Sequence, residues 1–309
     1  MKRIKNWIRN AVYAQIENEI RSLKFSLGQS SVLASRANSS NFQNLWDAEV
    51  KVYSQWGEDG ILDFLCEKLL ISKPRVLEIG AGNFRECNSK FLAENRNASV
   101  YLVDGREDLI PTVNRDALIW KNHLFAVNTW VSPNNIEQIY RDASLKMNGV
   151  DILSLDIDGN DYWVLESCPL DEVQIVVVEY NPLFGSEFPV TVPRDDQFVR
   201  RDKHHSCLYY GASLGAFIKL MNSRNFEFIG TNRAGNNAFF VKSTEMGKIQ
   251  IRPKQELSVY TDWRIRETRD SVGKLSLKSG IERVSEIGFL PLVNLQSHDA
   301  MTVAEANNI

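Results

Sequence analysis

The spacing of hydrophobic residues divides the chain into two parts that meet near residue 50. Over residues 1–27 apolar residues recur in steps of three and four, which predicts an amphipathic helix with one apolar stripe. The stripe consists of Ile4, Ile8, Val12, Ile16, Ile20, Leu23 and Leu27. Gly28 and a Ser- and Asn-rich stretch to about residue 41 predict the end of this helix.

From Val52 onward, short apolar runs alternate with helical patterns. The predicted helices are 57–71, 88–96, 134–146 and 212–224. Five nearly continuous Val/Ile/Leu runs predict buried parallel strands, at 75–80, 99–105, 124–131, 151–158 and 173–181. An antiparallel hairpin is predicted from two further apolar runs, 226–231 and 238–242, which are joined by the turn-forming sequence NRAGNN.

This order of elements predicts an α/β fold with a Rossmann-like, mostly parallel sheet that ends in an antiparallel hairpin, the layout of class I methyltransferases. We expect an N-terminal helix and linker over 1–45, the sheet domain over 46–242 and a C-terminal extension over 243–309. The extension is mixed in charge and less regular, and we expect it to pack on the domain or line its mouth.

Composition narrows the class of protein. Of 309 residues, 43% are hydrophobic and 24% charged, which is typical of a globular chain. The net charge of −3 gives no general basis for binding nucleic acid. The four cysteines form no CxxC pair, so we expect reduced thiols in a cytoplasmic protein rather than a zinc knuckle.

The segment VLEIGAGNFRECN (76–88) carries the strongest candidate chemistry. Gly80 and Gly82 follow a buried strand, and without a Cβ they let the backbone pass close to a bound nucleoside. The dinucleotide fingerprint needs a third glycine at the position of Arg85, which disfavours NAD and FAD. Asp104 ends the next strand, where it is placed to accept hydrogen bonds from both ribose hydroxyls. A nucleoside pocket is predicted, and a structural turn is the alternative.

Several segments resemble a bacterial methyltransferase group related to the FkbM-type enzymes, from about Val52 to Lys242. They are VLEIGAGNFRECNSKFL, YLVDG, AVNTWVSP, DILSLDIDGNDYWVL and VVVEYNPLFG, with YSQWGEDGIL before them and YYGASLGAF and GNNAFFVK after them. The resemblance implies a class I fold, S-adenosylmethionine as methyl donor, and an oxygen acceptor, often in surface-polysaccharide or glycolipid biosynthesis. It also implies an acid near the methionine half of the cofactor. The expected cofactor contacts are Glu78, Gly80, Ala81, Gly82, Asp104, Gly105, Asn128 and Asp156.

Carboxylates gather at the ends of the fourth and fifth predicted strands. A sugar hydroxyl needs a general base or a metal to become a nucleophile at neutral pH. Asp156 and Asp158, two residues apart, would face one side of a strand and are candidates for acid–base or substrate contact. The layout also resembles metal-dependent O-methyltransferases, which implies Mg²⁺ bound by Asp156, Glu179 and Asn181, although Tyr180 splits the acid–Asn pair. The alternative is a tight turn followed by a helix capped by Asp161.

Other candidates come from loops. His204 and His205 lie in the segment where substrate loops usually occur, and histidine is the usual proton acceptor near neutral pH; a surface position is the alternative. Phe84 and Trp130 are candidates to flank the adenine or the sulfonium, with a core position as the alternative.

The first interpretation is therefore an S-adenosylmethionine-dependent O-methyltransferase that acts on a sugar, glycolipid or polysaccharide precursor. The alternatives are a non-catalytic scaffold with the same fold and a nucleotide-sugar or NAD-dependent enzyme. We expect the N-terminal helix to pack on its own domain or pair in a homodimer. Its cations and Trp7 leave a peripheral contact with the inner membrane face as the alternative, which Glu17 and Glu19 weaken.

Overall fold

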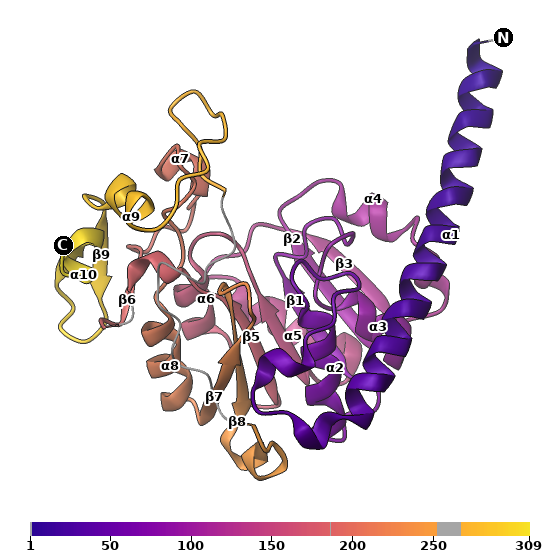
Figure 1. The fold of residues 1–309 in the computed structure, drawn as a ribbon, viewed down its shortest axis with the longest axis horizontal. Helices are drawn as coiled ribbons and strands as arrows, with labels where there is room; N and C mark the ends of the chain where they lie inside the picture. The colour runs from indigo at the N-terminus through magenta and orange to yellow at the C-terminus, as the bar shows by residue number, and fades with distance from the viewer. Residues whose placement is uncertain (1, 186, 252–266) are drawn as a thin grey trace.

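The computed structural model describes residues 2–185, 187–251 and 267–309, and in this part of the chain the main sheet has seven strands (Figure 1). Its strand order is β3-β2-β1-β4-β5-β8-β7. The first five strands in this order, β3, β2, β1, β4 and β5, pair in parallel. Strand β8 is antiparallel to both of its neighbours, β5 and β7. The strands are β1 (Arg75–Ile79), β2 (Ser99–Asp104), β3 (Leu124–Asn128), β4 (Ile152–Leu155), β5 (Ile175–Glu179), β7 (Phe226–Thr231) and β8 (Asn237–Lys242).

Helices cover both faces of this sheet. One face packs against α2 (Glu58–Lys68), α3 (Lys90–Arg96) and α4 (Leu109–Val113). The other packs against α5 (Ile136–Met147), α6 (Asp161–Ser167) and α8 (Leu214–Ser223). The predicted α/β class, the parallel sheet and the terminal hairpin are confirmed.

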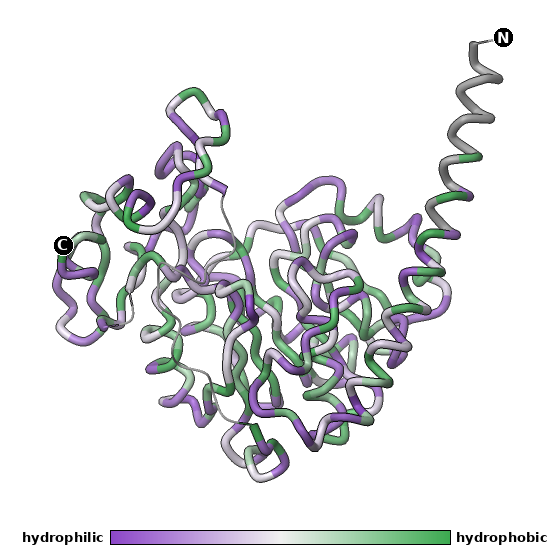
Figure 2. The backbone as a smooth tube through the Cα atoms, viewed as in Figure 1, coloured by the Kyte–Doolittle hydropathy of each residue, from purple (hydrophilic) through white to green (hydrophobic). Residues whose placement is uncertain are grey.

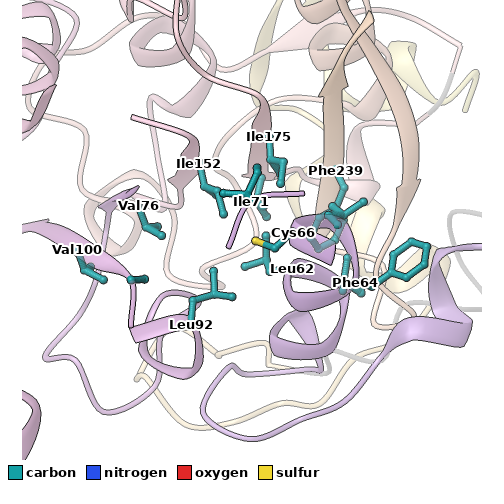
Figure 3. Close-up of a cluster of buried hydrophobic side chains, with 14 of the residues drawn as sticks. Leu62, Phe64, Cys66, Ile71, Val76, Leu92, Val100, Ile152, Ile175 and Phe239 are labelled. Atoms are coloured by element: carbon teal, nitrogen blue, oxygen red, sulfur yellow. The ribbon is translucent and has the colours of Figure 1, made fainter. Parts of the chain in front are cut away.

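The two faces of the sheet form two separate cores because side chains alternate along each strand. Val76, Val100, Ile152 and Ile175 point toward α2 and α3, where Figure 3 shows them gathered with Leu62, Cys66 and Leu92. Their chain neighbours, such as Leu77 and Tyr101, belong to the core on the opposite face. Continuous apolar runs are therefore needed in every parallel strand, which is the pattern that identified them.

A second, three-stranded sheet lies beside the first within the described residues, in the order β10-β9-β6. Strand β6 (Val190–Thr191) precedes residue 242, whereas β9 (Pro291–Asn294) and β10 (Ala300–Thr302) follow it. This sheet shares a small core with α9 (Ile281–Ile287) and α10 (Val303–Ala306). The expected extension over 243–309 is thus joined to the loop after β5, with 252–266 outside the described residues.

The N-terminal helix is longer than the sequence predicted. Helix α1 (Lys2–Ala37) continues through Gly28, where the sequence predicted its end. A Cβ on Gly28 would lie 2.4 Å from a methyl carbon of Val52, so the glycine allows a close approach to the domain rather than stopping the helix. The first turns of α1 extend beyond the rest of the molecule (Figure 1).

All five parallel strands end earlier than predicted, and β3, β4 and β5 do so by two or three residues, at Asn128, Leu155 and Glu179. The difference matters most for β4, because Asp156 and Asp158 lie on the loop beyond it and not on one side of a strand. Among the described residues, no helix has both the length and the apolar character needed to cross a bilayer.

Candidate active site

A cavity of about 510 Å³ opens at the carboxyl edge of the parallel strands. It lies at the ends of β1, β2 and β4, where the strand order reverses. Ligands of open α/β sheets bind at this edge, in cavities of roughly 300–1,000 Å³. The lining residues are Gly80, Gly82, Asp104, Gly105, Arg106, Trp130, Val131, Asp156, Ile157, Asp158, Asn160 and Phe198.

Two glycines shape the floor of the cavity. Gly80 has φ +83°, and a Cβ there would lie 1.5 Å from the carbonyl oxygen of Asp156. Glycine is therefore required for the end of β1 to pass over the end of β4. Gly82 has φ +57°, and a Cβ there would meet no atom within 4 Å. The open space beside Gly82 is the cavity itself, so a flat ligand can approach the backbone at this point.

Asp104 ends β2 and holds the glycine loop in place. Its carboxylate accepts hydrogen bonds from the backbone N–H of Gly82 at 2.7 Å and of Arg106 at 2.8 Å. Burial raises the pKa of Asp104, which the two backbone donors oppose. Each carboxylate oxygen keeps acceptor capacity beyond these bonds, so Asp104 can also receive hydroxyl donors from a ligand.

Glu78 lies outside the cavity lining, contrary to the expectation of a direct cofactor contact. It is buried and accepts hydrogen bonds from the backbone N–H of Asn88 at 2.7 Å and of Ser89 at 3.0 Å, and from the Ser89 hydroxyl. Burial raises the pKa of Glu78. The acid therefore fixes the bend between β1 and α3, a positioning role that sequence spacing could not distinguish from ligand contact.

Two other expected contacts are also displaced from the cavity. Ala81 is fully buried in the core. Asn128 donates its side-chain N–H to the carbonyl oxygens of Asp104 at 3.3 Å and Arg106 at 2.5 Å. Asn128 thus stabilises the turn after β2, while Gly105 on the same turn lines the cavity.

The two aromatic candidates have different positions. Trp130 lines the cavity, and its indole N–H donates to the carbonyl oxygen of Asp196 at 2.8 Å. Phe84 is fully buried among the core side chains. Of the two, only Trp130 can contact a ligand.

Acidic side chains from the ends of β4 and β5 meet at the cavity. Carboxylate oxygens of Asp156, Asp158 and Glu179 all lie within 4.8 Å of one another. Asp161 supports this loop by accepting hydrogen bonds from the backbone N–H of Ile157 at 2.8 Å and of Gly159 at 2.9 Å. The structure therefore brings the predicted acids together through a loop rather than through strand periodicity.

Asp156 and Glu179 form a closely coupled acid pair. Burial and the neighbouring carboxylates raise the pKa of both groups well above the usual range. Their carboxylate oxygens lie within 4.8 Å of each other, so the charge on one group disfavours ionisation of the other. Oε2 of Glu179 accepts no hydrogen bond among the described residues. The two carboxyls therefore take up protons more readily than ordinary carboxyls do, and in the deprotonated form they can act as a base near the cavity.

Arg200, at the start of α7 (Arg200–Lys203), supplies a cation to this cluster, and the sequence analysis missed it. Its guanidinium donates to the Asp158 carboxylate and to the carbonyl oxygen of Cys207, and it lies 4.0 Å from the ring centre of Tyr210. Nothing in the spacing of residues 200–210 indicates the contact with the acid cluster, because Asp158 lies 42 residues before Arg200 in the chain.

A second chamber of about 310 Å³ adjoins the first. The two share Trp130, Ile157, Asp158 and Phe198. The remaining lining is more polar and comes from the loop after β6 and the C-terminal segment: Val199, Arg200, Arg201, Cys207 and Glu267. Two adjoining chambers that share Asp158 suit a reaction between two bound molecules.

Asn181, expected as a metal ligand, is instead a structural residue. Its side-chain N–H groups donate to the carbonyl oxygens of Leu208 and Tyr210, and its Oδ1 accepts from the backbone N–H of Leu183. These bonds hold the loop after β5 against the segment before α8.

His204 and His205 lie outside the lining of both chambers. Their rings stack with centroids 4.2 Å apart, and His205 Nε2 is 3.0 Å from Glu286 on α9. His204 Nδ1 is 2.7 Å from the Ser206 hydroxyl. The pair therefore joins the α7 loop to the C-terminal segment, and the expected catalytic role does not fit this position.

No sequence profile of a known protein family matches the chain, and no curated protein matches it. Among solved structures, it is similar to a 1,6-didemethyltoxoflavin-N1-methyltransferase of Burkholderia thailandensis with bound S-adenosylhomocysteine, at 11% identity and TM-score 0.34, over 57% of this chain and 77% of that one. An O-methyltransferase family protein of the same organism has 11% identity and TM-score 0.34, over 60% and 58%.

An O-methyltransferase family 2 protein of Planctomyces limnophilus in complex with apigenin has 12% identity and TM-score 0.33, over 70% of this chain and 62% of that one. The chain spans less than two thirds of this structure and of the second. At TM-scores this low, the similarity to these structures carries no argument about function, which has to be inferred from the residues of the site. Strand order and the antiparallel hairpin nevertheless give the chain the Rossmann-like fold expected of class I methyltransferases.

Proposed function

We propose that the chain is an S-adenosylmethionine-dependent methyltransferase. The observation that carries this proposal is the cavity in which the exposed backbone at Gly82 and the carboxylate of Asp104 lie side by side. A nucleoside fits there with its ribose hydroxyls on Asp104 and its flat surfaces against the glycine backbone and Trp130. Arg85 in place of a third glycine, and an antiparallel strand β8 beside β5, both argue against a dinucleotide enzyme.

The residues of the second half of the site suit proton removal from a hydroxyl. Held by Asp104 and the backbone at Gly82, the cofactor would supply a methyl group on a sulfonium, which would be transferred to the acceptor oxygen with the thioether as the leaving group. The Asp156–Glu179 pair accepts the hydroxyl proton as the O–H bond breaks. Arg200 holds Asp158 at the junction of the two chambers, where it can orient the acceptor.

For the acceptor, we propose a hydroxyl of a sugar, glycolipid or polysaccharide precursor. The resemblance to the FkbM-related group implies this class. The polar lining of the second chamber, with Asp158, Arg200, Arg201 and Glu267, supports it, because hydroxyl-rich molecules need several hydrogen-bonding partners.

Calorimetric titration tests the cofactor assignment. We expect S-adenosylhomocysteine to bind the purified chain with one site per molecule and NAD⁺ to give no heat of binding. Methyl transfer is then tested with radiolabelled S-adenosylmethionine and a panel of nucleotide sugars and glycolipid precursors. Binding without transfer to any acceptor would favour a non-catalytic scaffold, and NAD⁺ binding alone would contradict the proposal.

A Mg²⁺-dependent reaction is the second candidate. Two observations favour it, since Mg²⁺ binds carboxylate oxygens. The carboxylates of Asp156, Asp158 and Glu179 lie close together, and Oε2 of Glu179 has no hydrogen-bond partner among the described residues. The metal would polarise the acceptor oxygen. Asn181 would not take part, because its amide is engaged elsewhere.

We nevertheless expect turnover to persist after dialysis against EDTA and to be unchanged by added Mg²⁺, because Arg200 already supplies positive charge to Asp158. Rates would be measured before dialysis, after it and after Mg²⁺ is restored, with Ca²⁺ as a control cation. If EDTA abolished turnover and Mg²⁺ but not Ca²⁺ restored it, the mechanism would depend on a metal ion rather than on the proton-accepting pair.

A further inference from the structure

Among the described side chains of α1, those that pack on the domain lie mainly on one face of the helix. Arg21 is 2.8 Å from Asp116, and the ring of Phe25 lies 6.1 Å from that of Phe91. Farther along the same face, Val32 is buried, and the guanidinium of Arg36 binds Asp63. At about 100° per residue, Arg21, Phe25, Gly28, Val32 and Arg36 fall within roughly 80° of arc.

The opposite face of α1 carries an exposed apolar stripe. Its side chains are 48% to 69% exposed, although each would be expected in a core: Val12, Ile16, Ile20, Leu23 and Leu27. On the same angular scale they also lie within about 80°, and the centre of the stripe is about 160° from the face that packs on the domain. A contiguous exposed stripe of this kind indicates an interaction surface. Figure 2 shows hydrophobic positions recurring along α1.

The spacing within the stripe is that of a coiled coil. Ile16, Ile20, Leu23 and Leu27 follow one another in steps of four, three and four, the order d-a-d-a of a heptad. With Ile20 at an a position, Glu19 is at g, on one edge of the stripe. Lys24 is at e, on the other edge, where its ammonium lies 5.3 Å from the ring of Tyr53. In a parallel pair of helices, the g side chain of one chain lies beside the e side chain five residues farther along the other.

We propose that α1 pairs in parallel with α1 of a second copy of this chain through the stripe from Val12 to Leu27. In that pair Glu19 of each copy faces Lys24 of the other, so the charges at both edges are complementary. The two domains do not collide, because each packs on the side of its own helix that faces away from the pair. One surface serves both copies, as a two-fold dimer requires.

A lipid surface is the other partner that an amphipathic helix suits. Glu19 at the edge of the stripe argues against it, because anionic headgroups would repel this carboxylate. The side chains of the first eleven residues, including Trp7 and the N-terminal cations, lie outside the described ones and enter neither argument.

Sedimentation equilibrium over a range of protein concentrations tests the proposal. We expect the full-length chain to form a concentration-dependent dimer and the double variant Ile20→Glu with Leu23→Glu to remain a monomer, because four carboxylates would be buried in the stripe. The matched control is Leu145→Glu on α5, which replaces a leucine that is also exposed, 82% accessible, away from α1. The control should dimerise like the unmodified chain. Circular dichroism of each variant confirms that α1 and the domain remain folded.

Oxidative cross-linking tests the parallel orientation. Leu27→Cys should form a covalent dimer, since residue 27 of one copy lies opposite residue 27 of the other only in a parallel pair. The four native cysteines are buried and should give no background. A chain that is monomeric at all concentrations, a double variant that still dimerises, or a dimer that Leu27→Cys fails to cross-link would each overturn the proposal. A monomer that floats with vesicles containing phosphatidylglycerol would assign the stripe to a membrane instead.

Discussion

Replacing Asp156 by Asn lowers the rate of methyl transfer by about 10² to 10⁴, the usual contribution of a positioned general base. The amide keeps the size of the side chain but cannot accept the proton of the acceptor hydroxyl. The cavity and Asp104 are unaffected, so the affinity for S-adenosylhomocysteine should change little. Steady-state kinetics and calorimetric titration on the same preparation measure both quantities.

The pH dependence of turnover gives a second measure of the same pair. Because burial and the neighbouring carboxylates raise the pKa of Asp156 and Glu179, both groups take up protons at a higher pH than ordinary carboxyls do. The rate should therefore fall as the pH falls through this raised pKa, above the usual range near 4. Above that pH the pair holds one proton or none and remains able to act as a base.

Asp158→Asn is the matched comparison for Asp156→Asn. It removes a carboxylate from the same loop, but one that is bound to Arg200 at the acceptor chamber. We expect it mainly to raise the KM for the acceptor. Its turnover number should fall less, relative to the unmodified chain, than that of Asp156→Asn. Equal rates for Asp156→Asn and the unmodified chain would remove the pair from the mechanism. Equal losses of turnover in both variants would assign the base to the cluster rather than to Asp156.

Replacing Asp104 by Ala is expected to weaken S-adenosylhomocysteine binding by roughly a hundredfold. A ribose bound to this carboxylate would lose two hydrogen bonds to a charged acceptor, each contributing about 1.5 kcal/mol. The glycine loop would also lose its anchor, because the backbone N–H of Gly82 donates to the same side chain. Titration calorimetry measures the change in affinity, and thermal unfolding without ligand shows whether the fold is intact.

Asp108→Asn is the control for this prediction. Asp108 lies four residues farther along, is bound to Arg106 and Asn83, and does not line the cavity. Its replacement should leave the dissociation constant within about threefold. Unchanged affinity in Asp104→Ala would contradict a ribose contact, and equal losses in both variants would indicate a general disturbance of the loop.

The sheet and the glycine loop could be predicted because their signals are local. Each parallel strand is covered on both faces, so Val76 and Leu77 must both be apolar, and the run is visible without knowing the partners. Gly80 and Gly82 need positive φ within a few residues of a strand end. Asp104 is the last residue of its own strand. For such features the sequence neighbours of a residue are also its physical environment.

The acid cluster was predicted in part. Asp156 and Asp158 follow β4, and Glu179 ends β5. These strands pair, so the approach of the three side chains could be expected from the order of strands alone. Their chemistry could not, because it depends on burial and on Arg200, which lies at the start of α7, 42 residues after Asp158. Asn181 and the two histidines suited the predicted roles by residue type but not by position.

By itself, then, the sequence determined the class of fold, the position of the glycine loop after β1 and the residues at the strand ends that line the cavity. Only the tertiary structure decided that Glu78 shapes a loop, that Gly28 lies within α1 and that one face of this helix is left exposed. The reason is physical: backbone conformation and strand burial are set over a few neighbouring residues, whereas the hydrogen-bond partners and exposure of a polar or helical side chain depend on segments far away in the chain.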